Sequence, residues 1–247
     1  MTQRCALITG GTSGLGEAMA RKLHDAGHTV LVTHHSRAGS ADQWLQDQAT
    51  AGYTFRVYDV DVSDYDSCQE LARRIEADGH TVDILVNNAG VTRDATFRKM
   101  EKQKWDAVLR TNLDSMFNVT KPFIEGMTSR GWGRVVCISS VNGTKGQFGQ
   151  TNYSAAKAGI QGFTKALAQE VARKGVTVNA ISPGYIATAM VAAVDPDILE
   201  KQIVSQIPVG RLGRPEEIAA TAAFLCTEEA GYITGANIAV NGGMHMC

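Results

Sequence analysis

Residues 5–16 read CALITGGTSGLG, and this stretch decides the fold of the chain. A buried strand runs into a turn that contains Gly10, Gly14 and Gly16, and a helix is expected over 14–26, closed by Gly27. Glycine lets the backbone turn sharply, and the helix N-terminus offers free N–H groups and the positive end of a dipole. The unit predicts a diphosphate site. Its spacing, G-x3-G-x-G, differs from the common G-x-G-x-x-G, and a tight turn without a ligand is the alternative.

Short β-rich runs alternate with helical stretches along the whole chain. We expect strands at 5–9, 29–33, 54–58, 82–86, 134–138, 176–181 and 237–240, and further helices near 40–51, 64–78, 102–128 and 152–173. Near-continuous apolar strands separated by helices are typical of a parallel sheet covered on both faces. The predicted fold class is therefore α/β: a doubly wound, Rossmann-like, seven-stranded parallel sheet with helices on both faces.

No linker, repeat or low-complexity segment interrupts this pattern, so residues 1–247 are predicted to form a single nucleotide-binding domain. The irregular stretch 184–214 follows the carboxyl end of a parallel strand, which is where ligands bind in such sheets. We interpret it as a substrate lid, with a long connection as the alternative.

Composition and charge argue against several classes of protein. The formal net charge is -1 over 247 residues, which is not the footprint of a nucleic-acid-binding protein. We see no signal peptide and no apolar run of about 18 residues, which predicts no membrane contact. Five cysteines without a CxxC pair, and the adjacent His34-His35, indicate neither a disulfide framework nor a metal site. We expect a cytoplasmic protein.

The end of the second strand indicates which dinucleotide is bound. In such folds an acidic residue at this point accepts hydrogen bonds from the ribose 2′-hydroxyl of NAD. Here the run is Thr33-His34-His35-Ser36-Arg37, and no acid occurs until Asp42. A 2′-phosphate needs donors and positive charge, which Arg37, Ser36 and His35 can supply. The sequence predicts NADP(H), although Arg37 can also be read as a solvated loop cation.

Two further loops follow predicted strands at the same edge of the sheet. Asp61 can accept from an adenine amine, or it can be an acid at a helix start beside the capping Ser63. The run Asn87-Asn88-Ala89-Gly90 has small residues against which a ribose can lie, and amides that can pin the glycine turn. We interpret this run as more specific evidence for a nucleotide site than the glycines alone.

Tyr153 and Lys157 are four residues apart near the start of a predicted helix, which places them on one face. A nearby ammonium and a positively charged nicotinamide ring would favour phenolate, so together they would lower the pKa of Tyr153 from its ordinary value of about 10. Tyr153 is then a candidate general acid or base, and Ser140, at a strand end, a donor to the developing oxyanion. Asn112 could position a water between Lys157 and solvent. Taken singly, such a Tyr–Lys pair is usually a surface packing pair.

Together these residues resemble the short-chain dehydrogenase/reductase family over essentially the whole chain. The resemblance implies a catalytic tetrad of Asn112, Ser140, Tyr153 and Lys157. In the family, the Ile186 backbone and the Thr188 hydroxyl hold the nicotinamide carboxamide and Lys157 the ribose. The full set of expected NADP(H)-binding residues is Gly10, Thr12, Ser13, Gly14, Leu15, Gly16, His35, Ser36, Arg37, Asp61, Val62, Asn88, Ala89, Gly90, Tyr153, Lys157, Pro183, Gly184, Ile186 and Thr188.

Several longer runs look like one branch of that family, the acetoacetyl-CoA reductases of polyhydroxybutyrate synthesis. These runs are 88–94, 131–134, 139–143, 146–153 and 241–245. The resemblance implies NADPH-dependent reduction of acetoacetyl-CoA to (R)-3-hydroxybutanoyl-CoA by a homotetramer whose two long helices pack between subunits. The implied substrate pocket consists of Asp94, Ser140, Gln147, Phe148, Gly149, Gln150, Gly184 and Tyr185. Ala189 stands where many relatives have Asp, which bears on the lid and not on the chemistry.

Other functions are compatible with parts of the pattern. The related 3-oxoacyl-acyl-carrier-protein reductases share the tetrad, and the basic region 93–104 could receive either a carrier protein or a CoA ester. A non-catalytic NADP-binding sensor would need neither Tyr153 nor Ser140. A serine hydrolase is disfavoured because the chain contains no G-x-S-x-G.

Overall fold

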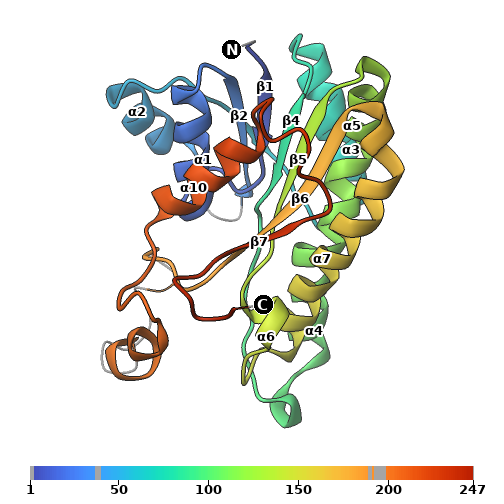
Figure 1. Cartoon of the computed structure of the whole chain (residues 1–247). Coiled ribbons are helices and arrows are strands. Elements are labelled where there is room, and N and C mark those ends of the chain that lie inside the picture. The colour runs from blue at the N-terminus through green and yellow to red at the C-terminus, as the bar shows by residue number, and fades with distance from the viewer. Residues whose placement is uncertain (1–2, 37–39, 189–190, 192–198, 247) are drawn as a thin grey trace.

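The computed structural model describes residues 3–36, 40–188, 191 and 199–246. Within these residues seven strands form one sheet in the order β3-β2-β1-β4-β5-β6-β7, and every neighbouring pair is parallel (Figure 1). The strands are β1 (Cys5–Ile8), β2 (Thr29–His34), β3 (Arg56–Asp59), β4 (Ile84–Asn87), β5 (Gly133–Ile138), β6 (Val176–Pro183) and β7 (Asn237–Val240). The predicted fold class is confirmed.

Helices cover both faces of this sheet (Figure 1). They are α1 (Gly14–Asp25), α2 (Asp42–Thr50), α3 (Tyr65–Ala77), α4 (Lys102–Leu109), α5 (Ser115–Arg130), α6 (Asn142–Lys145), α7 (Thr151–Val171) and α10 (Pro215–Leu225). One face carries α1 and α10, and the other carries α3, α5 and α7. None of the helices in the described part of the chain combines the length and the apolar character needed to cross a bilayer.

The two hydrophobic cores explain why the central strands are apolar at every position. Side chains alternate along β1, so Leu7 packs into the core under α3, α5 and α7, while Ala6 and Ile8 pack under α1 and α10. All three are fully buried. A fully buried Leu or Ile side chain stabilises a fold by roughly 1.5–3 kcal/mol, so both layers contribute to holding the sheet.

The strand order places a crevice beside β1. The chain runs outward from β1 to β3 and then returns to add β4 on the other side of β1. The loops that follow β1 and β4 therefore leave in opposite directions, and the space between them opens at the carboxyl edge of the sheet.

The third strand begins later than the sequence predicts. We expected a strand over 54–58, whereas β3 spans Arg56–Asp59. The Tyr53 amide donates to the Gln48 carbonyl at 2.9 Å, and the ring of Phe55 stacks on Trp44 with a centroid distance of 5.4 Å. Packing of this aromatic cluster thus keeps the residues before Arg56 out of the edge of the sheet.

The long helix predicted near 102–128 is divided into three parts. A π-helical turn, Arg110–Asp114, separates α4 from α5. The side chain of Asn112 in this turn bonds both backbone groups of Val91, accepting from the N–H at 2.8 Å and donating to the carbonyl at 2.9 Å. Inserted turns of this kind recur at functional sites, and here the turn faces the loop after β4.

The two ends of the stretch 184–214 are tied together. Ile186 pairs with Gly213, and the backbone bonds from Ala187 to Gly213 and from Gly213 to Tyr185 measure 2.8 and 3.0 Å. Short helical turns occupy 199–206 between these ends. Residues 189–190 and 192–198, with Ala189 among them, lie outside the described residues.

A close contact between α6 and α7 gives a test of the packing that positions the site. A Cβ added to Gly143 would lie 2.7 Å from the carbonyl carbon of Lys157. We expect Gly143→Ala to lower the free energy of unfolding by about 2 kcal/mol, because overpacking at backbone forces α7 to shift. Urea denaturation followed by circular dichroism measures this change.

Gly162→Ala is the matched control on α7, since an added Cβ there has no heavy atom within 4 Å. Alanine is the better helix former, so this variant should gain about 0.5–1 kcal/mol. Equal effects of the two variants would contradict the close-contact explanation.

Candidate active site

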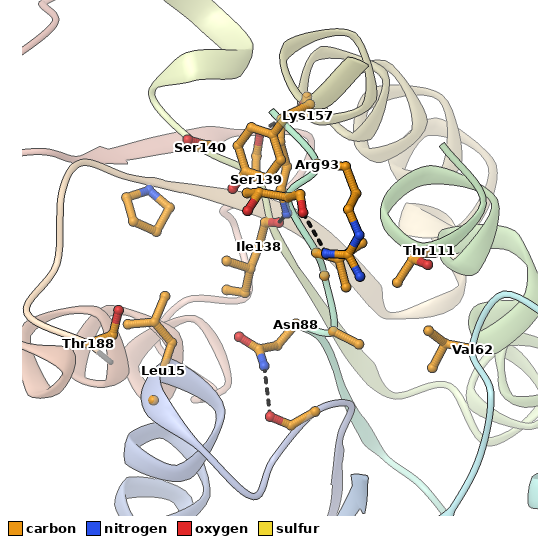
Figure 2. Close-up of a pocket in the computed structure, with 18 of the residues that line it drawn as sticks. Leu15, Val62, Asn88, Arg93, Thr111, Ile138, Ser139, Ser140, Lys157 and Thr188 are labelled. Atoms are coloured by element: carbon orange, nitrogen blue, oxygen red, sulfur yellow. Dashed lines mark hydrogen bonds between the residues drawn. The ribbon is translucent and has the colours of Figure 1, made fainter. Parts of the chain in front are cut away.

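A cleft of about 1020 Å³ opens at the carboxyl edge of the sheet, over the crevice between β1 and β4. Figure 2 shows Leu15 and Thr188 on one wall, Ser139, Ser140 and Lys157 grouped together, and Val62 and Thr111 toward another end. The predicted site residues that line the cleft are Gly10, Ser13, Gly14, Leu15, His35, Asp61, Val62, Asn88, Ala89, Gly90, Ser140, Gln150, Tyr153, Lys157, Pro183, Gly184, Tyr185, Ile186 and Thr188.

The glycine turn has the geometry that a diphosphate requires. Gly10 and Gly14 have φ angles of 61° and 53°, a region that residues with a side chain rarely adopt. Ser13 precedes α1 without a side-chain capping bond, so the first N–H groups of the helix remain available to an anion. A Cβ on Gly14 would lie 3.6 Å from the Thr188 methyl, so Thr188 sits directly over the turn.

The loop after β4 clamps this turn. The Asn88 amide nitrogen Nδ2 donates to the carbonyls of Thr9 (2.9 Å) and Gly10 (3.2 Å). In return, the Thr9 hydroxyl accepts from the backbone N–H groups of Asn88 (2.9 Å) and Ala89 (3.0 Å). Asn88 lies at the floor of the cleft in Figure 2. The arrangement agrees with the expectation that amides after the fourth strand pin the turn.

His35 and Ser36 directly follow β2, and the carboxylates of Asp59 and Asp61 beside them already have hydrogen-bond partners. Asp61 accepts at 2.9 and 2.6 Å from the backbone and hydroxyl of Ser63, and at 3.4 Å it pairs with His35. Burial alone would raise the pKa of Asp61, but the bonds from Ser63 and the His35 pair lower it overall. Ser36 donates to Asp59 at 2.8 Å and stays outside the cleft wall. Arg37 lies outside the described residues.

The catalytic candidates come from two elements that meet at the cleft. Tyr153 and Lys157 project from the same face of α7, with the Lys157 Nζ 5.5 Å from the centre of the tyrosine ring. The Lys157 ammonium donates to the Ile138 carbonyl at 2.7 Å, and the Ser139 hydroxyl donates to the Lys157 carbonyl at 2.8 Å. Ser140, at the end of β5, lines the cleft together with Tyr153, and its hydroxyl accepts from the Asn142 N–H at 3.1 Å. These contacts fix α7 against the end of β5.

Burial dominates the protonation of both groups. It raises the pKa of Tyr153 to about 12, and the negative groups Asp94 and Tyr185 act in the same direction, against the bond from Ser140. Burial lowers the pKa of Lys157 to about 8. In the protein without cofactor, burial therefore outweighs any effect of Lys157 on the pKa of Tyr153, because desolvation penalises phenolate and ammonium alike. The expected lowering also depends on a positively charged nicotinamide ring and stays a prediction.

Asn112 lies behind the cleft and not on its wall. It is fully buried, and both ends of its amide are engaged by Val91, as described above. A Cβ on Gly90 would lie 3.3 Å from the Asn112 oxygen and 3.7 Å from the Lys157 nitrogen. Asn112 and Lys157 therefore both lie close to the position that a side chain at Gly90 would occupy. This contact accounts for the small residue at position 90.

The predicted substrate pocket divides into a wall and a rim. Ser140, Gln150, Gly184 and Tyr185 line the cleft, whereas Asp94, Gln147, Phe148 and Gly149 do not. The rim forms where two loops run side by side, because the Ala95 amide donates to the Gly149 carbonyl at 2.9 Å. Phe148 is 86% exposed there. Thr12 and Gly16, which belong to the glycine turn, also do not line the cleft.

Several cleft residues were absent from the predicted sets. They are Ser139, Asn142, Asp106, Arg110 and Thr111, among others, while Arg93 and Gln103 belong to the basic region 93–104 that was predicted only as a landing site for the substrate. Asn142 stands two residues after Ser140, and Arg93 directly precedes Asp94, so both were adjacent to predicted positions. Their side chains face the cleft because of how the loops and the π-helical turn pack, which local sequence does not report.

Similarity to known proteins agrees with this geometry. Residues 10–245 match the family model described as enoyl-(acyl carrier protein) reductase. The chain is 54% identical over 246 residues to an acetoacetyl-CoA reductase of Cupriavidus necator, covering 100% of both chains. It is 53% identical to nodulation protein G of Azospirillum brasilense over 99% of both chains. A 3-oxoacyl-(acyl-carrier-protein) reductase of Vibrio harveyi is 42% identical over 98% of both chains.

The fold and the site define an oxidoreductase that uses a nicotinamide cofactor. A diphosphate turn, a clamped crevice at the strand reversal and a buried Ser–Tyr–Lys constellation meet in one cleft. The chain belongs to the short-chain dehydrogenase/reductase family, as its full-length match and these relatives show. The family resemblance expected from the sequence is confirmed.

The glycine turn offers a direct test of cofactor binding. A Cβ on Gly16 would lie 2.2 Å from the Gly10 carbonyl oxygen, the group that Asn88 holds. We expect Gly16→Ala to weaken nicotinamide dinucleotide binding at least about tenfold, equivalent to about 1.4 kcal/mol, because the phosphate turn must move. Fluorescence titration with reduced dinucleotide measures this. Gly162→Ala, on α7 with open space around it and no left-handed backbone, is the control and should leave binding unchanged.

Proposed function

We propose that this protein reduces acetoacetyl-CoA to (R)-3-hydroxybutanoyl-CoA with NADPH, a step that supplies the precursor of polyhydroxybutyrate. The proposal is supported chiefly by full-length relatives named acetoacetyl-CoA reductase, at 54% identity in Cupriavidus necator and 52% in Allochromatium vinosum. The cleft supports it chemically, since a serine, a tyrosine and a lysine converge where a ketone can meet the cofactor.

In this mechanism Tyr153 is the general acid. When bound, the reduced nicotinamide supplies the hydride that the ketone carbon receives. The Ser140 hydroxyl donates a hydrogen bond to the ketone oxygen, and Tyr153 gives it the proton. A phenol with a pKa of about 12 is fully protonated at neutral pH, so the acid is ready for reduction. Lys157, with a pKa of about 8, is mostly cationic at pH 7 and stabilises the phenolate that remains.

The other cofactor contacts follow the walls of the cleft. We assign the diphosphate to the turn Gly10–Gly16 with Asn88, the adenine to Asp61 and Val62, and the nicotinamide to Pro183–Thr188. His35 and Ser36, the described residues after β2, carry hydrogen-bond donors, and neither is acidic. This favours a 2′-phosphate and hence NADPH. The stretch 184–214 is proposed as the substrate lid.

Subunit association is proposed from the surface of the helices. Phe117 on α5 is 53% exposed and stacks on Tyr65 of α3, with ring centroids 5.9 Å apart. An exposed aromatic pair of this kind is typical of a surface that another subunit covers. We propose a homotetramer in the cytoplasm, with α5 and α7 at the subunit contacts.

The carrier-protein version of the reaction is the second candidate. It is favoured by the Vibrio harveyi relative, which is less similar to this chain than the acetoacetyl-CoA reductases are. A non-catalytic NADP sensor is disfavoured, because dinucleotide binding alone does not explain why Tyr153 and Lys157 are held together at such a desolvation cost.

A direct assay separates these functions. NADPH oxidation is followed by its absorbance with acetoacetyl-CoA, with the matched acetoacetyl carrier protein, and with NADH in place of NADPH. The proposal expects fast, NADPH-selective turnover of the CoA ester. Turnover of the carrier-protein ester alone would assign the protein to fatty-acid elongation, and turnover of neither would reopen the substrate.

Tyr153→Phe tests the general acid. The change removes one hydroxyl and keeps the ring, so we expect turnover to fall at least about 10³-fold while NADPH still binds. Single-turnover kinetics and a fluorescence titration measure the two quantities. Tyr58→Phe is the control, since that hydroxyl bonds Asp78 far from the cleft. Near-normal turnover of Tyr153→Phe would remove Tyr153 as the acid.

Arg37→Ala tests the dinucleotide preference predicted from the sequence. Loss of a guanidinium from a 2′-phosphate should weaken NADPH binding by about 1.5–3 kcal/mol and leave NADH binding nearly unchanged. Calorimetric titration with both cofactors measures this. If the affinities for NADPH and NADH fall by the same factor, Arg37 does not contact the 2′-phosphate.

A further inference from the structure

Asn152, the residue before Tyr153, is a buried polar side chain whose oxygen and nitrogen are both hydrogen-bonded. It is the second residue of α7, is 0% exposed and does not line the cleft. Its Oδ1 accepts from the Tyr153 backbone N–H at 2.8 Å, and its Nδ2 donates to the carbonyls of Arg93 at 3.0 Å and Lys104 at 3.3 Å. The partners allow one orientation of the amide, because only its oxygen can face the N–H and only its nitrogen can face the carbonyls.

The bond to Tyr153 takes the place of an ordinary helix cap. The first N–H groups of a helix have no partner inside it. The ladder of α7 begins with the Ser154 N–H, which donates to the Gln150 carbonyl at 2.8 Å, so the Tyr153 N–H comes one residue too early to join it. The Gln150 side chain, at the usual capping position, makes no capping bond. Asn152 therefore holds an N–H that the helix leaves unpaired, and that N–H belongs to the proposed acid.

The two bonds from the Asn152 nitrogen attach the start of α7 to segments across the cleft. Lys104 lies in the first turn of α4, and Arg93 lies in the loop after β4. The same loop is held two residues earlier, where Asn112 bonds both backbone groups of Val91. Two buried asparagines thus fix a loop segment that lines the cleft. The first turn of α7 cannot move relative to this loop without breaking these bonds.

One turn further along α7, Lys157 is held by a separate set of bonds. The Ser139 hydroxyl donates to its carbonyl at 2.8 Å, and its ammonium donates to the Ile138 carbonyl at 2.7 Å. Loss of the Asn152 bonds would therefore loosen the helix end that carries Tyr153 and leave Lys157 attached to the end of β5.

We propose that Asn152 is a positioning residue for the reduction, and that it fixes the first turn of α7 so that the Tyr153 hydroxyl lies within reach of the ketone oxygen. The inference rests on the proposed function, in which Tyr153 is the general acid. Proton transfer requires the acid to lie within hydrogen-bond distance of the atom that it protonates. A displacement of about 1 Å can cost about 10²-fold in rate, so a helix end that moves would hold the acid in place only part of the time.

The single-turnover rate constant with NADPH and acetoacetyl-CoA is the decisive measurement, because it does not depend on the fraction of the enzyme that is folded. Asn152→Ala removes all three bonds and should lower this constant about 30-fold, as expected for a misplaced acid. The amplitude of the reaction reports the active fraction. A fluorescence titration reports NADPH binding, which should stay nearly unchanged because other bonds hold Lys157 and the glycine turn.

Asn179→Ala is the matched control on β6. Asn179 is also 0% exposed and does not line the cleft, and its side chain donates to the Ile233 carbonyl at 2.7 Å and accepts from the Ala236 N–H at 3.1 Å. Its loss should destabilise the protein to urea and leave the rate constant unchanged. An equal fall of the rate constant in both variants would trace the effect to general destabilisation and overturn the positioning role.

A double mutant shows whether Asn152 acts through Tyr153. In Tyr153→Phe the hydroxyl is gone and nothing is left to position, so adding Asn152→Ala should change the residual rate constant by less than about twofold. If Asn152→Ala lowers the rate constant by the same factor in both backgrounds, Asn152 acts on another group and the proposal is wrong.

Asn152→Asp keeps the test decisive if the alanine variant does not fold, since the carboxyl group has nearly the same shape as the amide. An ionised carboxylate can only accept and loses both bonds to the carbonyls, whereas a protonated carboxyl can donate one of them. Burial favours the protonated form. The rate constant relative to wild type should therefore be low at alkaline pH and rise as the pH falls. A ratio that stays constant with pH would contradict the proposal.

The wild-type assay separates this inference from the proposed function. If wild type reduces acetoacetyl-CoA and Asn152→Ala keeps the wild-type rate constant, the reductase function stands and Asn152 is not a positioning residue. If wild type reduces only the carrier-protein ester, the same variants are measured with that ester and the same criteria apply. If wild type reduces neither ester, Tyr153 has no ketone to protonate, and both the function and the role of Asn152 are overturned.

Discussion

The hydrogen bonds between the ends of β1 and β4 are the constraint on which the rest of the site depends. The Thr9 hydroxyl and the Asn88 side chain bridge the two loops at distances of 2.9 to 3.2 Å. The strand order reverses at this point, so the loops diverge beyond the last bond between β1 and β4, from the Thr9 N–H to the Val86 carbonyl at 3.0 Å. The clamp extends the connection into the loops, and so holds the glycine turn at the start of α1 against the loop after β4.

The proposed catalytic groups, Tyr153 and Lys157, lie in a buried environment that disfavours their charged forms. Lys157 is 4% exposed, and its pKa is lowered while that of Tyr153 is raised, both by burial. The cost of burying the ammonium is offset by its bond to the Ile138 carbonyl. Because burial favours the neutral phenol, it prepares the site for donating a proton. A bound, oxidised nicotinamide would add positive charge beside Tyr153. This charge would favour the phenolate form that the reverse reaction needs.

Much of the fold and part of the site could be predicted from the sequence. The strand–turn–helix unit, the alternation of strands and helices, and the pairing of Tyr153 with Lys157 are local patterns, and the structure places them as expected. The π-helical turn was missed, because it depends on a contact between Asn112 and Val91, 21 residues away. The pKa of Tyr153 in the protein without cofactor could not be read from the sequence for a similar reason. The spacing of Tyr153 and Lys157 shows that the tyrosine has a charged neighbour. Only the packing shows that burial dominates the pKa of Tyr153.

The sequence by itself determined the layered parallel sheet, the glycine-rich turn and the placement of Tyr153 and Lys157 on one helix face, since backbone geometry imposes periods of two and three to four residues on any strand or helix. The tertiary structure alone decided which groups line the cleft, how they ionise and which way their hydrogen bonds point. The bond from Gln150 to Asp94 joins residues 56 apart, and Asn142 meets Gln150 where α6 folds against α7. The burial of these groups and the direction of their hydrogen bonds depend on contacts between segments distant in the chain. Local periodicity does not encode such contacts.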